Sequence, residues 1–137
     1  MRTQARIAVF NLIYINFFEQ IDLDNQESEN KFKEIFSYLT DLENLTENDK
    51  EFAKELFIAF CKNKDNIKNI IENSIVNYEI DRIYKTDLAL LYMGVTEIVY
   101  LNTPKPIVID EILKIAKQYS TEKSASFING VLAKITF

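Results

Sequence analysis

Two helical patterns meet at a polar turn near the end of the chain, and they restrict what the chain can fold into. Apolar side chains recur at helical spacing from Ile109 to Ala116, with charged residues between them, as in an amphipathic helix. A second apolar stripe begins at Phe127. Thr121 lies between the two patterns, where its hydroxyl can accept from the amides of the next turn. We therefore expect one helix over residues 108–119 and a second from the turn to the C-terminus.

The same helical period recurs upstream, interrupted by short polar segments. The first pattern leaves almost no polar face, which is typical of a central helix covered on most sides. Thr46, with Asp49 three residues later, and Thr86 occupy positions typical of N-caps. Pro104 and Pro106 end the helix that precedes them. The expected helices include residues 3–19, 32–39, 52–60, 67–75 and 88–100, with polar breaks over 21–30, 40–44, 63–66 and 102–106 and a short turn over 81–85.

Composition agrees with a helical fold. The 137 residues include only 2 Gly and 2 Pro, which leave few places for the tight turns of a β-sandwich or barrel. The sequence shows no strand alternation of useful length and no internal repeat. A chain of this length that is 47% hydrophobic can bury one sizeable core. We expect an all-α protein, a single globular domain of about six or seven helices over residues 1–137.

Charge and cysteine content limit the setting and the partners. The single cysteine, Cys61, excludes an internal disulfide, and the N-terminus does not resemble a secretory signal, so a cytoplasmic protein is expected. No apolar run approaches the roughly 20 residues needed to cross a bilayer. The net charge of -5 argues against nonspecific coating of nucleic acid. Because 11 of the 21 acidic residues lie between residues 19 and 52, the remainder is nearly balanced and a local anion site stays open.

Several kinds of chemistry are excluded by residue type. The chain has no histidine, which removes the Ser-His-Asp triad, the Cys/His nucleophile and the His-containing zinc site. Its two glycines, Gly94 and Gly130, cannot form a Gly-rich phosphate loop. Carboxylate pairs such as Asp22 with Asp24 lie in polar segments, where solvation explains them. We expect no catalytic residue, no metal and no cofactor.

Four features could serve binding, although a structural reading is the simpler one for Gly130 and for the arginine pair. Gly130 falls inside a helical pattern, which favours tight helix packing and leaves contact with an outside molecule as the alternative. Lys123 lies in the first turn of the last helix, where free amides can receive an anion. Phe127 is either core or a stacking surface for an unpaired base. Arg2 and Arg6, spaced i, i+4, project from one side of the first helix and are read most simply as a solvated helix end.

These residues occur within stretches that resemble a known family. The segment T-E-K-S-A-S-F-I-N-G-V-L-A-K-I from Thr121, preceded by P-I-V-I-D-E-I-L-K-I-A-K-Q-Y from Pro106, is similar to the C-terminal signature of the NusB family of bacterial transcription antitermination factors. D-R-I-Y-K-T-D-L-A-L-L-Y-M-G-V-T-E-I from Asp81 resembles the family's preceding helix. A-R-I-A-V-F-N-L-I-Y from Ala5 resembles its N-terminal start. The middle of the chain matches only in helical pattern.

The resemblance implies a fold, a function and a set of contacts. Members of the family are all-α, noncatalytic proteins that bind the boxA element of nascent single-stranded RNA together with NusE, a small-subunit ribosomal protein. They act with the RNA polymerase antitermination complex, in ribosomal RNA transcription. The RNA-binding residues that the resemblance implies are Arg2, Arg6, Tyr14 and Phe127, and the implied partner-binding residues are Asp87 and Lys123.

Alternative functions stay open at this point. Family members usually carry a denser arginine cluster before Ala5, so a protein-interaction module with weak or no RNA binding is one alternative. Another is the accessory domain of an RNA cytosine methyltransferase, which requires a Gly-rich cofactor domain that the chain, ending at Phe137, is expected to lack. A homodimer formed through the N-terminal surface is also open, because it would cover the arginines and compete with RNA.

Overall fold

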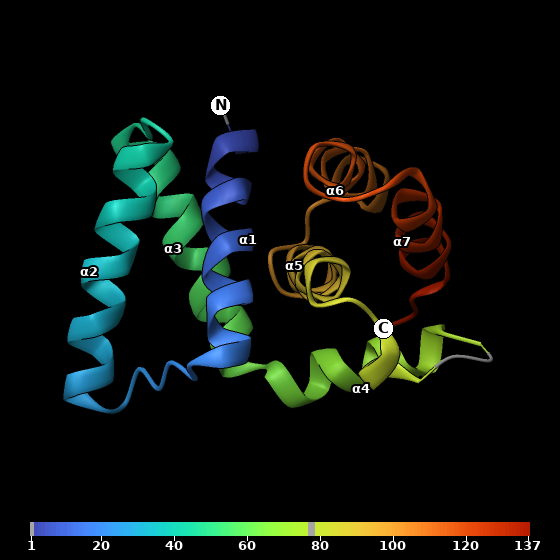
Figure 1. Ribbon diagram of the computed structural model, residues 1–137, viewed down its shortest axis with the longest axis horizontal. Helices are drawn as coiled ribbons and strands as arrows, with labels where there is room; N and C mark the ends of the chain where they lie inside the picture. The colour runs from blue at the N-terminus through green and yellow to red at the C-terminus, as the bar shows by residue number, and fades with distance from the viewer. Residues whose placement is uncertain (1, 77–78) are drawn as a thin grey trace. The chain divides into compact units, whose positions relative to one another are not determined.

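The computed structural model describes residues 2–76 and 79–137 and confirms the all-α class, with no strand in the described part (Figure 1). The chain divides into two compact units, residues 1–62 and residues 63–137. The first holds α1 (Arg2–Phe18), α2 (Gln26–Leu42) and α3 (Glu47–Lys62). The second holds α4 (Lys64–Ser74), the 3-10 turn η1 (Ile80–Arg82), α5 (Lys85–Tyr100), α6 (Lys105–Tyr119) and α7 (Glu122–Lys134).

The first unit is built on α1, which packs against both α3 and α2. Apolar side chains occupy most positions of α1, and this explains why so many of its residues are buried. Phe32 of α2 stacks on Phe57 of α3, with ring centroids 5.2 Å apart and planes at 7°. Phe60 lies next to Phe57, at 5.8 Å between centroids. Aromatic stacking therefore joins the two amphipathic helices at the centre of this unit.

The second unit is built around α5, which contacts α4, α6 and α7. Figure 1 shows α5 nearly end-on, with these three helices around it. Every residue of α5 from Asp87 to Ile98 is buried. A helix that is covered on all sides needs apolar residues all round, and the sequence L-A-L-L-Y-M-G-V supplies them.

The two glycines have opposite surroundings. A Cβ atom at Gly94 would lie 3.2 Å from two methyl carbons of Leu132 and 3.4 Å from Ile112, so α6 and α7 approach α5 closely at this residue. Gly130 is exposed, and an added Cβ would meet nothing within 4 Å. The preference for tight packing at Gly130 is therefore wrong. Contact with an outside molecule stays a prediction.

Several helix boundaries differ from those expected. The polar segment after α1 is not a loop as far as residue 30, because α2 already begins at Gln26. The Asn25 side chain accepts from the backbone N–H of Ser28 at 3.0 Å and caps this helix. Glu27 and Glu29 then lie in the first turn, where the helix dipole favours acidic residues. A capped, acidic helix start has the same composition as a polar loop, which explains the error.

Thr86 and Pro106 also led to wrong predictions of where α5 and α6 begin. Tyr84, not Thr86, is the N-cap residue of α5, and Thr86 lies within the helix. Helix α6 begins at Lys105 and not near residue 108, since Pro106 occupies the first turn, where a missing N–H costs nothing. Thr46 is confirmed as a cap, because its hydroxyl oxygen accepts from the Asp49 N–H at 3.2 Å. Smaller shifts occur at α2, which continues to Leu42, at α4, which starts at Lys64, and at α7, which ends at Lys134.

The glycine surroundings predict opposite effects of a single methyl group. Gly130→Ala should raise the free energy of unfolding by about 0.5–1 kcal/mol, because alanine has the higher helix propensity and no atom obstructs it. Gly94→Ala should lower it, because the buried Leu132 must shift to admit the methyl group. Urea unfolding followed by circular dichroism measures both changes. Stabilisation by Gly94→Ala equal to that by Gly130→Ala would contradict the close approach at α5.

Tyr92 predicts how stability responds to alkaline pH. Burial, and after it the charges of Glu72, Asp65 and Asp81, raises the pKa of Tyr92 from 10.0 to about 12. The stability that this shift contributes is complete below pH 10, where folded and unfolded states both keep the phenol proton, and is lost as pH rises toward 12. Between pH 10 and pH 12, the urea concentration at the midpoint of unfolding should fall more steeply with pH for the wild type than for Tyr92→Phe. Parallel curves for the two proteins would contradict the shift.

Candidate functional site

The two arginines of α1 share one aromatic neighbour. The guanidinium carbon of Arg2 lies 4.4 Å from the centroid of the Phe52 ring, and that of Arg6 lies 5.2 Å from it. A cation over an aromatic face is attracted to it, most strongly where water is excluded. Arg2 is exposed, whereas Arg6 is only 4% exposed. The interpretation of the pair as a solvated helix end is therefore wrong for Arg6.

The last part of α1 presents two aromatic side chains to solvent. Tyr14 is 37% exposed and Phe18 is 67% exposed. Their ring centroids lie 5.3 Å apart, with planes at 57°. Helix α1 is covered on most sides, as expected, and these two rings are exceptions near its end. Phe18 was not singled out from the sequence, although its i, i+4 spacing from Tyr14 was an available signal.

Three of the predicted residues line one cavity in the second unit. Asp87, Lys123 and Phe127 surround a cavity of about 370 Å3, whose lining is completed by Ser124 and by Ile83 and Tyr84. Lys123 is exposed and Phe127 is half-buried. Tyr84 is 77% exposed and adds a second aromatic side chain to the rim. No sequence signal marked Tyr84, because tyrosine is not a typical N-cap residue.

Asp87 occupies the buried side of this cavity. It is 3% exposed, and both of its carboxylate oxygens accept a hydrogen bond from a serine hydroxyl. Ser120 donates to Oδ1 at 2.8 Å, and Ser124 donates to Oδ2 at 2.7 Å. Ser120 lies at the end of α6 and Ser124 in the first turn of α7. The carboxylate therefore joins α5 to the turn between α6 and α7.

Helix α7 is held at both ends. At its start Thr121 is the N-cap, as predicted, and its hydroxyl oxygen accepts from the Ser124 N–H at 3.0 Å. At its end the ammonium of Lys105 donates to the carbonyl oxygens of Ala133 and Ile135, each at 3.0 Å. A carboxylate near the start and an ammonium at the end both agree with the helix dipole. The first turn, with Lys123, thus has a defined backbone position beside the cavity.

The predicted residues fall into two groups. Arg2, Arg6 and Tyr14 belong to the unit of residues 1–62, and the other three belong to the unit of residues 63–137. Within the second unit the structure brings Asp87, Lys123 and Phe127 together at one cavity. Within the first unit it brings the two arginines together at Phe52.

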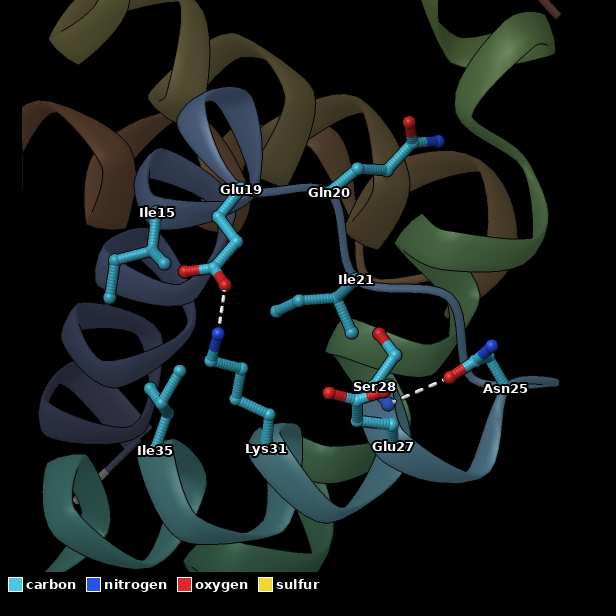
Figure 2. A pocket seen from close by; sticks show the side chains of 9 residues that line it. All are labelled: Ile15, Glu19, Gln20, Ile21, Asn25, Glu27, Ser28, Lys31 and Ile35. Carbon is cyan, nitrogen blue, oxygen red and sulfur yellow. Dashed lines mark hydrogen bonds and ion pairs between the residues drawn. The ribbon is translucent and has the colours of Figure 1, made fainter.

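A further cavity of about 190 Å3 lies in the first unit and contains none of the predicted residues (Figure 2). Ile15, Ile21 and Ile35 supply its apolar lining. Lys31 of α2 reaches the Glu19 carboxylate, and the hydrogen bond and then the charge of Glu19 raise the pKa of Lys31. Since Lys31 and Glu19 already pair with each other, we assign no binding role to this cavity.

Among residues 2–76 and 79–137, no three His, Cys, Asp or Glu side chains are grouped so that they could hold a metal ion. No helix in these two ranges combines the length and apolarity that a membrane span requires.

The sequence profile of the NusB family matches residues 3–137. The chain belongs to the NusB family. Among its relatives, the transcription antitermination protein NusB of Finegoldia magna is 39% identical over 135 residues, covering 98% of this chain and 92% of the relative. The NusB protein of Fusobacterium nucleatum is 36% identical over 136 residues, covering 96% of this chain and 85% of the relative.

Solved structures of NusB proteins share the fold. The NusB chain crystallised with the antitermination factor NusE and dsRNA is 27% identical, with a TM-score of 0.80, covering 96% of this chain and 92% of that one. The solution structure of NusB from Aquifex aeolicus gives a TM-score of 0.77 at 27% identity, covering 97% and 85%. The NusB fold thus extends over both compact units of the chain.

In this NusB-family chain, the burial of Arg6 predicts a structural cost for its removal. Arg6→Ala should lower the free energy of unfolding by about 1–2 kcal/mol, because a desolvated cation–π contact and a packed aliphatic stem are lost. Arg2→Ala is the matched control and should cost less, since Arg2 is exposed. Urea unfolding measures both. Equal costs would show that the burial of Arg6 adds no stability.

Proposed function

We propose that this chain is a noncatalytic transcription antitermination factor that binds boxA-type single-stranded RNA as a heterodimer with NusE. In this proposal residues 1–137 act as one RNA-binding domain in the cytoplasm. The heterodimer on its RNA joins the RNA polymerase antitermination complex and supports ribosomal RNA transcription.

The family match over residues 3–137 is the observation that carries the proposal. The match extends over both compact units of the chain. The similar solved structure, in which a NusB protein is bound to NusE and dsRNA, supports both a protein partner and an RNA ligand for this chain.

Four of the predicted residues have proposed roles that fit their surroundings. Arg2, exposed at the start of α1, neutralises a phosphate, and Tyr14, partly exposed on the same helix, stacks on a base. Phe127 offers a second stacking surface at the cavity rim, and Lys123 borders the partner. Arg6 is only 4% exposed and cannot reach a phosphate without moving, so the exposed Arg2 is better placed for this role.

A second candidate function is a protein-interaction module that does not bind RNA. The burial of Arg6 favours it, because only one arginine of the pair is exposed. The net charge of -5 favours it as well. The two functions differ in salt dependence. RNA affinity that falls steeply with added salt is expected only where phosphates are contacted.

The proposal predicts a ternary complex with measurable contributions from α1. The full chain, purified NusE and a fluorescent boxA-type RNA should form one complex by size-exclusion chromatography with light scattering. In anisotropy titrations Tyr14→Ala should weaken RNA binding by about tenfold, the effect of losing one base-stacking contact. Arg2→Ala should reduce the slope of log affinity against log salt by about 1, because one phosphate contact is lost.

Tyr38→Ala is the matched control for Tyr14→Ala, since Tyr38 is a 66% exposed tyrosine on α2 with no proposed contact. It should leave RNA affinity unchanged. The absence of RNA binding by the wild-type chain with NusE, together with a stable protein heterodimer, would reject RNA binding and favour the interaction module. A wild-type chain that self-associates and loses this state on adding RNA would support the homodimer as a competing state.

A further inference from the structure

We propose that Asp87 supports partner and RNA binding as a positioning residue and does not itself contact the partner. Through Ser120 and Ser124 it holds the first turn of α7, and so it sets the position of Lys123 beside the cavity. This inference rests on the proposed function, which it deepens by changing the role of one residue. Ser120 and Ser124, which no sequence signal assigned to binding, become part of the site.

The burial of Asp87 makes a direct contact costly. The residue is 3% exposed, and each carboxylate oxygen already accepts a hydroxyl proton inside the protein. A partner that reached this carboxylate would have to displace Ser120 or Ser124. The reoriented carboxylate, and the displaced hydroxyl where it is that of Ser124, would then need new hydrogen-bond partners at positions that are only 3% and 6% exposed.

The hydrogen bonds form one directed chain. The Thr121 hydroxyl donates to the Ser124 hydroxyl oxygen at 3.1 Å, and the Ser124 hydroxyl donates to Asp87. The Thr121 oxygen in turn accepts from the Ser124 N–H, so the cap of α7 and the carboxylate belong to the same network. Ser120 closes the network from the end of α6. The donors run toward Asp87, which must therefore act as an acceptor.

Lys123 lies between the anchored residues Ser120 and Ser124, so its backbone is held on both sides. A helix end without tertiary anchors frays, and a frayed turn must be ordered again when a partner binds. With the anchors in place, that ordering has occurred before binding. Lys123 is then presented to a ligand at no further conformational cost beyond that of its own side chain.

The variant Asp87→Asn distinguishes a positioning role of Asp87 from a direct contact between its charge and the partner. Its carbonyl oxygen can still accept from Ser124, and its amide can donate to the oxygen of the half-buried Ser120, whose hydroxyl proton turns to solvent. The anchors are kept while the charge is lost. A partner that pairs with the carboxylate charge would lose that contact in Asp87→Asn as completely as in Asp87→Ala.

Binding of NusE and boxA-type RNA by the full chain tests the two roles. Positioning predicts that Asp87→Ala and the double variant Ser120→Ala with Ser124→Ala weaken binding by about tenfold, while Asp87→Asn stays within about threefold of wild type. In the Lys123→Ala background, Asp87→Ala should have little further effect, because both changes act on one contact. Equal losses in Asp87→Asn and Asp87→Ala, with unchanged binding by the double serine variant, would overturn the inference.

Two control variants exclude indirect causes. Lys105→Ala releases the opposite end of α7 and should lower stability without changing binding. Asp110→Asn removes one exposed carboxylate charge from α6 of the same unit and should leave binding unchanged. If Lys105→Ala weakened binding as much as Asp87→Ala, general loosening of α7 would explain the effect and the inference would fail.

Amide hydrogen exchange in the free protein gives a readout that needs no ligand. Exchange at residues 124–126, whose amides are the first hydrogen-bonded ones of α7, should rise about tenfold or more in Asp87→Ala and remain near wild type in Asp87→Asn. Unchanged exchange in Asp87→Ala would overturn the positioning role, whether or not RNA binds. A wild-type chain that binds neither NusE nor RNA would instead reject the proposed function, and the exchange comparison would still decide whether Asp87 holds the turn.

Discussion

A carboxylate removed from water must find hydrogen-bond donors within the protein, and this requirement organises the C-terminal unit. Asp87 satisfies it with the hydroxyls of Ser120 and Ser124, which come from two other helices. As a result α5, the turn after α6 and the start of α7 meet at one place. The cavity and the exposed Lys123 lie beside that place. At the other end of α7 the ammonium of Lys105 binds the last carbonyls, so both ends of the helix are fixed by groups that suit its dipole.

In the N-terminal unit, one aromatic ring contacts two arginines that differ in burial. Phe52 lies beneath both guanidinium groups, but Arg6 is buried there while Arg2 remains exposed. A buried guanidinium contributes mainly to packing and an exposed one mainly to ligand attraction. The i, i+4 spacing that makes the two residues look equivalent in sequence thus hides two different environments. Exposed aromatic rings of Tyr14 and Phe18 follow further along the same helix.

Most helices were predictable because their apolar period is strong, as in α1, α5 and α7. Capping by Thr46 and Thr121 was predictable as well, since a cap is a local hydrogen bond. The start of α2 was not, because an acidic first turn has the composition of a loop. Tyr84 could not be recognised as a cap or as part of the cavity rim. Its position depends on the packing of α5 against distant residues.

The sequence by itself determined the family, the all-α class and the residues to inspect, because short-range helical periods and a motif such as F-I-N-G are read directly from the order of residues. Tertiary structure alone decided which of these residues are accessible. It buried Arg6 and Asp87, exposed Gly130 and placed the close helix approach at Gly94 instead. Burial is set by neighbours that are distant in sequence, such as Leu132 for Gly94 and Ser124 for Asp87. No local pattern contains that information.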